Sequence, residues 1–293
     1  RYIGFVAERL FGIFLTHQLR TVPDLKVKYL QAGFFNSLDC PYPTPIQHDR
    51  CVSIALTLSD TYAVLGSVLL QSIIENAKPA DYYDFLVLDS GMNATSRTML
   101  SDQIEQYANT SIRFINIEKA LEPFKLPLIL HLTNATYGRL FVLEYLRNYE
   151  KVLYLDADIV ANGDIAELYR TDLDSVYLAA VRDTVSAGWC CMPEHIMQKY
   201  IKDTIQLKDP FDYFNGGVLL FNISLLRSKY STQQLLTLAQ KKSWTWMDQD
   251  VLNHICRGNV LLLGQEWNVM AHTGQQAIDP PEKYAPVWLQ NAY

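Results

Sequence analysis

The sequence predicts an α/β fold, in which helices flank a mostly parallel, Rossmann-like sheet. From residue 51 on, short apolar runs alternate with amphipathic stretches, as in repeated strand–helix units. The 293 residues, 49% of them hydrophobic, are also enough to bury a full core. The expected strands are residues 52–58, 84–88, 112–117, 151–155 and 176–181, and the helices between them are residues 62–76, 95–107 and 137–148.

The first fifty residues have a different pattern. Residues 3–19 carry apolar side chains at helical spacing, which predicts an amphipathic helix that ends before Pro23. Residues 40–45 are rich in proline and predict an extended connector. We therefore expect residues 1–50 to be the tail of a preceding domain, and residues 51–293 to form the main domain.

Composition and charge exclude two kinds of partner. The formal net charge is −6 and no basic stripe is present, so we expect no binding to nucleic acid and no polybasic contact with a membrane. The five cysteines lack the spacing of metal ligands or paired disulfides, which predicts free thiols in a reducing, cytoplasmic setting.

Two carboxylates follow the apolar run at residues 151–155. Ligands of a parallel sheet bind at the carboxyl ends of its strands, and this is where Asp156 and Asp158 lie. Residues two apart in an extended chain point the same way, so both side chains can reach one cation. Mn²⁺ or Mg²⁺ held by one or two carboxylates, with phosphate oxygens in other positions, suits a diphosphate ligand.

The same Asp-x-Asp spacing occurs twice more, which makes it a weak signal by itself. The pair at 172/174 lies between a predicted helix and a strand and is expected to form a solvated turn. The pair at 248/250 begins a helical apolar pattern through Ile255, so Asp248 is a candidate N-cap, with Asp250 in the first turn. Only the pair at 156/158 follows an apolar strand.

Two further clusters lie at expected strand ends. Asn215, Gly216 and Gly217 begin an apolar strand through residue 222, where glycines indicate either a close ligand or a β-bulge. The end of the first strand and the residues just past it, residues 55–62, either bind a nucleoside or simply start a helix.

These clusters, in this order, resemble the family 8 glycosyltransferases, the group that contains glycogenin and the bacterial lipooligosaccharide galactosyltransferases. The likeness covers roughly residues 51–270 and includes Thr136-Tyr-Gly-Arg139, Tyr154-Leu-Asp-Ala-Asp158, residues 214–222, Asp248-Gln-Asp-Val-Leu-Asn253 and Trp267-Asn268. It implies a GT-A fold and retaining transfer of a hexose, glucose or galactose, from a UDP-sugar to a saccharide or glycoconjugate, with Mn²⁺ or Mg²⁺ as cofactor.

The resemblance also implies a role for each matching residue. The donor-binding residues are Thr57, Ser59, Asp60, Tyr62, Arg139, Asp156, Ala157, Asn215, Gly216 and Gly217. In this set, the Tyr62 ring stacks on uracil and Arg139 approaches the diphosphate or the sugar of the donor. Asp156 and Asp158 bind the metal, while Gln249, Asp248 and Asp183 are the candidate catalytic residues. Acceptor pockets are built by variable loops, here residues 183–214, where the rings of Trp189 and Tyr213 either stack on a sugar or, at least as often, belong to the local core.

Two departures from the family pattern stand out. Ser59 occupies a position at which relatives often carry Asp or Asn, which weakens the preference for UDP. His272 comes too early for the metal-binding histidine of the family, so we expect a C-terminal truncation, with His272 as a less favoured ligand. Residues 1–11 resemble the tail of a domain of bacterial polysaccharide transferases, which implies a longer enzyme that contacts the inner face of the membrane through other segments.

Two alternatives to a glycosyltransferase remain open from the residues. A sugar nucleotidyltransferase shares the sheet and the metal carboxylates, although residues 58–62 lack the glycine-rich loop expected after its first strand. A non-catalytic module that binds a nucleotide sugar is the other.

Overall fold

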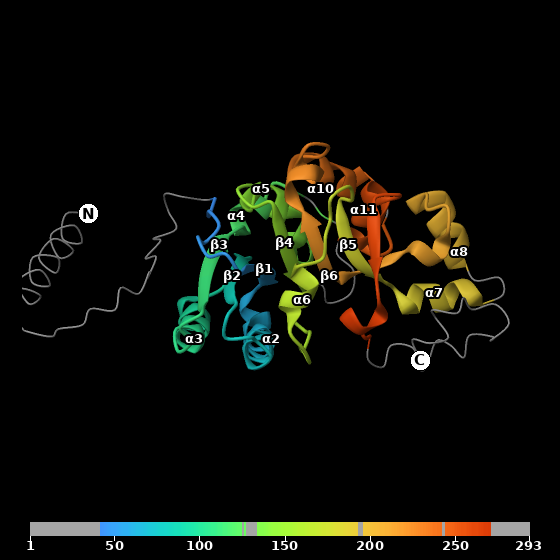
Figure 1. The fold of residues 1–293 in the computed structure, drawn as a ribbon. Coiled ribbons are helices and arrows are strands. Elements are labelled where there is room, and N and C mark those ends of the chain that lie inside the picture. Colours follow the sequence, from blue (N-terminus) through green and yellow to red (C-terminus); the bar gives the residue numbers. More distant parts are fainter. Residues whose placement is uncertain (1–41, 125, 127–133, 193–195, 242–243, 271–293) are drawn as a thin grey trace, which may run out of the picture. The chain divides into compact units, whose positions relative to one another are not determined.

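The computed structural model describes residues 42–124, 126, 134–192, 196–241 and 244–270. Its centre is a seven-stranded sheet with the order β3-β2-β1-β4-β6-β5-β7 (Figure 1). The strands are β1 Cys51–Leu58, β2 Tyr82–Asp89, β3 Thr110–Asn116, β4 Lys151–Leu155, β5 Leu178–Arg182, β6 Phe214–Asn222 and β7 Val260–Leu263. The predicted α/β class and mostly parallel sheet are therefore confirmed.

One strand runs against the others. β6 lies between β4 and β5 and is antiparallel to both, whereas every other neighbouring pair is parallel. The start of β6 therefore meets the end of β4, and the backbone N–H of Asp156 donates to the carbonyl of Gly217 at 2.9 Å. This reversal brings two clusters that are 60 residues apart in the sequence to the same edge of the sheet.

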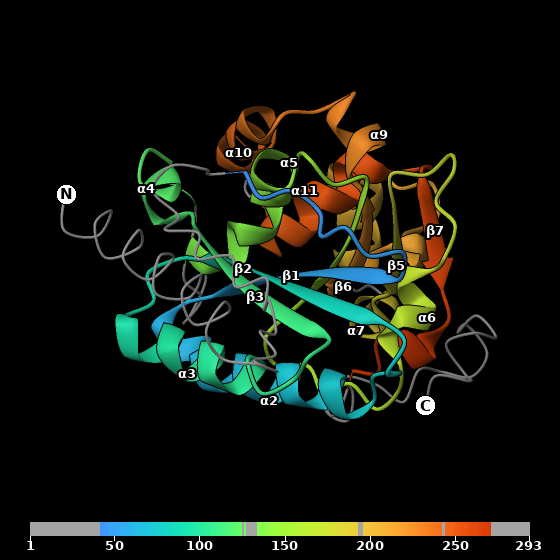
Figure 2. The same cartoon turned by 60° about the vertical axis from the view of Figure 1, so that its left-hand side comes forward.

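Helices cover both faces of the sheet (Figure 2). The first face packs against α2 Ala63–Glu75, α3 Ala94–Ile104 and α6 Ile165–Tyr169. The second face packs against α5 Val142–Tyr145, α10 Thr232–Lys241 and α11 Met247–Cys256. The remaining helices are α4 Glu118–Leu121, α7 Thr184–Cys191, α8 Ile196–Tyr200 and α9 Ile223–Arg227. Residues on β1 alternate between these cores, with Ile54 in the first and Ala55 in the second, as the two-residue repeat of a strand requires.

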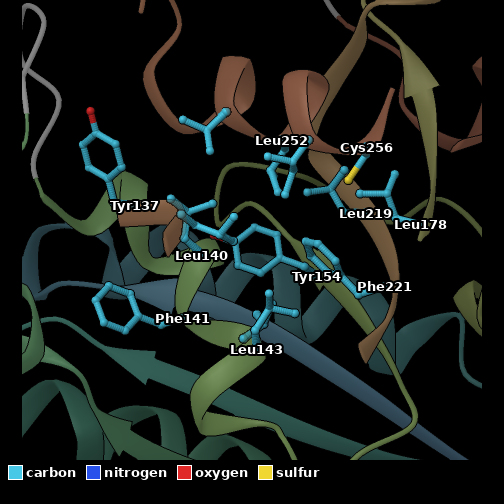
Figure 3. Packing of buried hydrophobic residues seen from close by; sticks show 14 of the residues in the cluster. Tyr137, Leu140, Phe141, Leu143, Tyr154, Leu178, Leu219, Phe221, Leu252 and Cys256 are labelled. Carbon is cyan, nitrogen blue, oxygen red and sulfur yellow. The ribbon is translucent and has the colours of Figure 1, made fainter. Parts of the chain in front are cut away.

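The second core reaches the functional end of the sheet (Figure 3). Tyr154, one residue before the end of β4, belongs to this core with Leu140, Phe141 and Leu252, and Phe221 of β6 belongs to it nearer the start of β4. Tyr154 and Phe221 are at most 2% exposed. Because such cores are as densely packed as organic crystals, the backbone that follows Tyr154 is held firmly in place.

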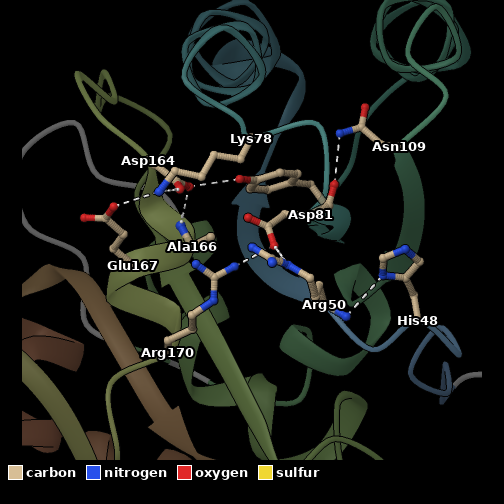
Figure 4. A network of polar contacts seen from close by, with 10 residues as sticks. His48, Arg50, Lys78, Asp81, Asn109, Asp164, Ala166, Glu167 and Arg170 are labelled. Atoms are coloured by element: carbon tan, nitrogen blue, oxygen red, sulfur yellow. Dashed lines mark hydrogen bonds and ion pairs between the residues drawn. The ribbon is translucent and has the colours of Figure 1, made fainter.

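A polar network ties the sheet together at the amino ends of β1 and β2 (Figure 4). The buried carboxylate of Asp81 pairs with Arg50 at 2.6 Å and with Arg170 at 2.5 Å. Nearby, Lys78 bridges Asp164 and Glu167 at 2.9 and 2.8 Å. These charges balance one another at the end opposite the candidate site, so we assign them a structural role.

The sequence predicted most elements but misassigned two features. The helix expected at residues 137–148 is instead a 3₁₀ segment, Asn134–Phe141, followed by the four-residue α5. Asp248 is not an N-cap, because Trp246 holds that position and the Asp248 carboxylate pairs with Arg139. The turn predicted at 172/174 is confirmed: Asp174 N–H donates to the exposed Asp172 at 3.1 Å.

Some predictions fall on residues that the structure does not describe. The helix at 3–19, residues 40 and 41 of the connector, and His272 lie outside the described residues, whereas residues 42–45 of the connector form neither helix nor strand. Within the described part, no helix is both long enough and apolar enough to cross a membrane.

Candidate active site

Arg139 is the centre of the candidate site. Its guanidinium pairs with Asp156, at the end of β4, at 2.8 Å and with Asp248, in the first turn of α11, at 2.6 Å. It also donates to the Gly216 carbonyl of β6 and lies over the Tyr154 ring, 5.0 Å from the ring centroid. One cation therefore joins three segments that are far apart in the sequence.

This ion-pair cluster is largely withdrawn from water. The side chains of Arg139 and Asp248 are 8% and 3% exposed, whereas that of Asp156 is 31% exposed. Burial raises the pKa of Asp248 to about 7, although Arg139 opposes the rise. Burial likewise raises the pKa of Asp156, opposed by Arg139 and increased by the negative charge of Asp158. The two aspartates after β4 therefore repel each other in the absence of a further cation.

The residues present fit part of a divalent metal site. Asp158 is exposed, and Asp156 is partly exposed at the same strand end. A Cβ atom on Gly217 would lie 3.3 Å from Asp156 Oδ2, so glycine keeps that side of the carboxylate open. Within the described ranges, no third His, Cys, Asp or Glu completes a metal-binding group. The pair can supply two oxygen ligands, as Mg²⁺ and Mn²⁺ accept when phosphate and water fill the other positions.

The two glycines make room for other side chains of the site. A Cβ atom on Gly216 would collide with the Arg139 guanidinium, and one on Gly217 would contact Asn215 as well as Asp156. The β-bulge alternative also has a structural counterpart, since the register between β5 and β6 shifts between Ala180 and Arg182. The two glycines therefore make room for neighbouring side chains and also lie where the strand pairing is irregular.

The Asp183 carboxylate connects the remaining predicted residues. Its Oδ1 caps α7 by accepting from Ser186 N–H at 2.7 Å. Its Oδ2 accepts from the side-chain amides of Asn215 at 3.1 Å and Gln249 at 3.3 Å. Asp183 is 5% exposed, so in this arrangement it orients two amides rather than lining open surface.

Thr57, near the end of β1, connects the first strand with Tyr154 and with the 3₁₀ segment that carries Arg139. Its hydroxyl accepts from Tyr154 O–H at 3.2 Å, and a Cβ atom on Gly138 would overlap its side chain. The other predicted residues of the cluster at 55–62 lie beside it along the chain. The Ser59 Oγ atom is buried and has no hydrogen-bond partner within the described residues.

Two more members of that cluster are less closely connected. Asp60 is exposed and accepts from Ser96 Oγ at 2.6 Å and from Asn93 Nδ2 at 2.7 Å, which joins it to the start of α3. Tyr62 is half-buried against the first core, and Ala157, between Asp156 and Asp158 in the chain, is buried.

Two residues of the sequence motifs, Asn253 and Asn268, had no role predicted for them. Asn253 is fully buried and bonds both the N–H and the carbonyl of Phe214, each at 2.9 Å, which fixes α11 against β6. Asn268 donates to Asn215 at 2.9 Å. Asn253 lies four residues after Gln249 and therefore on the same face of the helix. This spacing could have indicated that Asn253 also contacts β6.

Of the two roles that the sequence left open for Tyr213, the structure supports the core residue. Its ring is 1% exposed and its hydroxyl donates to Asp250, so it is not available to stack on a sugar. Trp189, the other ring proposed for the acceptor pocket, stacks on Trp246 with ring centroids 5.8 Å apart. Trp246, which is 38% exposed, is the ring of this pair that faces solvent near α11.

Acidic, amide and arginine side chains gathered at the strand ends of an α/β sheet lie where such folds bind their ligands. The family model described as "Glycosyl transferase family 8" matches residues 53–285, which is most of the chain. The chain therefore belongs to glycosyl transferase family 8, as its sequence motifs predicted.

Individual relatives agree with this assignment. The lipopolysaccharide 1,2-glucosyltransferase of Escherichia coli is 25% identical over 77% of this chain and 64% of its own length. The apo structure of the bifunctional glycosyltransferase WbbM matches with a TM-score of 0.69 and 29% identity, over 91% of this chain and 48% of that one. The galactosyltransferase LgtC, solved with donor and acceptor sugar analogues, matches with a TM-score of 0.60 and 26% identity, over 78% and 82%. The chain spans less than two thirds of the first curated relatives it matches.

Proposed function

We propose that this chain transfers a hexose, glucose or galactose, from a UDP-sugar to a saccharide or glycoconjugate with retention of configuration, and that it needs Mn²⁺ or Mg²⁺. The observation that carries the proposal is the Arg139 guanidinium, which gathers Asp156, Gly216 and Asp248 at the strand ends. The relatives named as a glucosyltransferase and a galactosyltransferase support a hexose as the transferred group.

The charges of the site suit a sugar diphosphate. Asp156 and Asp158 would hold the metal, which when bound neutralises negative charge on the diphosphate. Arg139 lies beside Asp156 and presents a cation on the same side of the sheet. Ser59, with its unpaired hydroxyl, and Thr57 lie at the end of β1, where we expect the nucleoside to bind.

Retention has a physical argument in the contacts of the buried carboxylates. A double-displacement mechanism needs a carboxylate that is free to attack the sugar. Asp248 is paired with Arg139, Asp183 accepts from two amides, and Asp250 accepts from two tyrosines. We therefore favour attack by the acceptor hydroxyl on the face from which the diphosphate leaves. The new oxygen–carbon bond forms as the carbon–diphosphate bond breaks, and the hydroxyl proton passes to a phosphate oxygen.

A donor panel tests the proposal directly. Purified protein is incubated with UDP-glucose, UDP-galactose, UDP-N-acetylglucosamine and GDP-mannose, with Mn²⁺ or with EDTA, and free nucleoside diphosphate is measured. We expect UDP release from a UDP-hexose with Mn²⁺ and little with EDTA. Release that EDTA leaves unchanged would contradict the metal requirement, and no release from any donor would contradict the activity.

Two controls separate the alternatives. A sugar nucleotidyltransferase would release pyrophosphate from UTP and a hexose 1-phosphate, which we do not expect. A non-catalytic module would bind UDP without turning over any sugar donor. The cytoplasmic setting and a peripheral contact with the membrane stay predictions, which fractionation of cells that express the whole protein would test.

A further inference from the structure

The side-chain amide of Gln249 is held in one orientation by three partners. Its Oε1 accepts from the backbone N–H of Gly216 at 2.8 Å. Its Nε2 lies 3.2 Å from the Tyr213 hydroxyl and 3.3 Å from Asp183 Oδ2. A backbone N–H can only donate and a carboxylate can only accept, so the oxygen must face Gly216 and the nitrogen must face Asp183.

Asp250 fixes the role of Tyr213 in this arrangement. The buried Asp250 carboxylate accepts from the hydroxyls of Tyr200 and Tyr213, each at 2.5 Å, and from Trp246 N–H at 2.7 Å. Burial raises the pKa of Asp250, and these three donated hydrogen bonds oppose the rise. Because Tyr213 gives its only proton to Asp250, its oxygen can only accept from Gln249.

The same network holds an unusual turn in place. Met247, the residue before Asp248, has a φ of 45°, which is uncommon for a residue other than glycine and requires support from its surroundings. Asp250 binds the N–H of Trp246 on one side of Met247, and the Trp246 carbonyl accepts from Gln249 N–H at 3.0 Å. The backbone of Gln249 and its side chain are therefore fixed by one connected set of bonds.

We propose that Tyr213 is a positioning residue for Gln249, held by Asp250, and that it leaves the Gln249 amide able to accept a hydrogen bond from a ligand but not to donate one. Both N–H groups of the amide are used by Tyr213 and Asp183, while Oε1 has two lone pairs and uses one on Gly216. The group that faces Gln249 in the complex is thus a hydrogen-bond donor such as a hexose hydroxyl, a statement that rests on the proposed function.

The two tyrosines that bind Asp250 provide a matched pair of variants. Tyr213→Phe removes the contact with both Asp250 and Gln249, and frees one amide N–H. Tyr200→Phe removes an equally short bond to Asp250 and the bond from Thr245 N–H, but no contact with Gln249. We expect Tyr213→Phe to lower kcat for UDP release by about tenfold with the donor KM nearly unchanged, since one hydrogen bond is lost. Tyr200→Phe should lower kcat by less than about twofold.

A double-mutant cycle tests the contact itself, whether or not the chain turns over a UDP-sugar. The unfolding midpoint is measured for Tyr213→Phe, Gln249→Leu and the double variant, and for the corresponding set with Tyr200→Phe. We expect the 213/249 changes to be non-additive, and the 200/249 changes to add. Additive effects in both sets, or equal losses of kcat in the two tyrosine variants, would overturn the inference. Non-additivity in a chain that turns over no donor would instead count against the proposed function alone.

Discussion

Replacing Arg139 by methionine tests the charge balance of the site most severely. The guanidinium is the partner of Asp248, and the two side chains are 8% and 3% exposed. Removing one partner of a buried ion pair costs about 3–5 kcal/mol of folding free energy. We expect the lower end, about 3 kcal/mol, because the abandoned Asp248 carboxyl takes up a proton instead of remaining charged.

The expected loss can be followed by thermal unfolding. For a domain of this size, 1 kcal/mol corresponds to about 2–4 °C in the unfolding midpoint, so Arg139→Met should lower it by about 6–12 °C at pH 8. Arg182→Met is the matched control, because Arg182 and Asp212 form a pair at 3.1 Å whose side chains are 26% and 47% exposed. Arg182 is partly exposed and Asp212 is exposed, and such a pair contributes about 1 kcal/mol or less, so the control should lower the midpoint by at most about 4 °C.

The dependence of stability on pH tests the same prediction in a second way. Burial raises the pKa of Asp248 from 3.8 to about 7, so the folded chain binds more protons than the unfolded chain between these values. The stability of the wild type relative to Asp248→Asn therefore falls as the pH rises through this range. At pH 6 the Asp248 carboxyl is mostly protonated, so Arg139→Met should lower the unfolding midpoint by less than it does at pH 8.

A second substitution completes the test of Arg139. In the Arg139→Met background, Asp248→Asn removes one of the two abandoned acids, and it should recover part of the midpoint at pH 8 and reduce the difference between pH 6 and pH 8, while Asp156 stays without its partner. The reasoning would be refuted if Arg139→Met destabilised no more than Arg182→Met, or if Asp248→Asn recovered nothing.

Two further predictions concern the end of β1. Gly138→Ala places a Cβ atom against the Thr57 side chain, and we expect a loss of about 1–3 kcal/mol together with a higher donor KM. Gly163→Ala meets open space and should change neither quantity, so similar thermal unfolding and donor KM for the two variants would speak against the packing argument. Asp60→Ala removes the carboxylate that bonds Asn93 and Ser96, and should raise the donor KM by about three- to tenfold while kcat is retained. Saturation curves for UDP-sugar check this, and a loss of kcat with an unchanged KM is the result that would count against it.

The sequence indicated the site best where the signal was local. The run at residues 151–155 is the same as the bounds of β4, because a buried strand reads as a continuous apolar stretch that ends where the chain becomes polar. The position of Asp156 and Asp158 after that run distinguished them from the pair at 172/174, which forms an exposed turn. Context, and not the spacing of the two acids, carried that prediction.

Contacts between distant segments were beyond the sequence pattern. Asp248 has the local features of an N-cap, but Arg139, more than a hundred residues earlier, provides a stronger partner for its charge. Residues 137–148 have helical periodicity, yet Gly138 packs on Thr57 and Arg139 reaches the Gly216 carbonyl, and the chain there forms a 3₁₀ segment. Apolar periodicity does not report such contacts, nor the antiparallel direction of β6.

The same limit applies to the network around Gln249. Tyr213 has an aromatic ring of the kind that stacks on sugars. In the structure its side chain is buried, and its hydroxyl donates to the buried Asp250. An aromatic side chain in a variable loop is at least as often a core residue as a sugar-stacking one. Only the fold shows which of the two roles it has.

Calorimetry of UDP binding in the presence of Mn²⁺ tests the central claim most directly. Asp156→Asn and Asp172→Asn change the same residue type in the same Asp-x-Asp spacing, one at the end of β4 and one in an exposed turn. We predict that Asp156→Asn, or EDTA with the wild type, weakens UDP binding by at least about tenfold, the effect of losing roughly one metal–phosphate contact, whereas Asp172→Asn binds as the wild type does. Equal binding by both variants, or wild-type binding that EDTA does not change, would contradict a metal-dependent UDP site at Asp156 and Asp158.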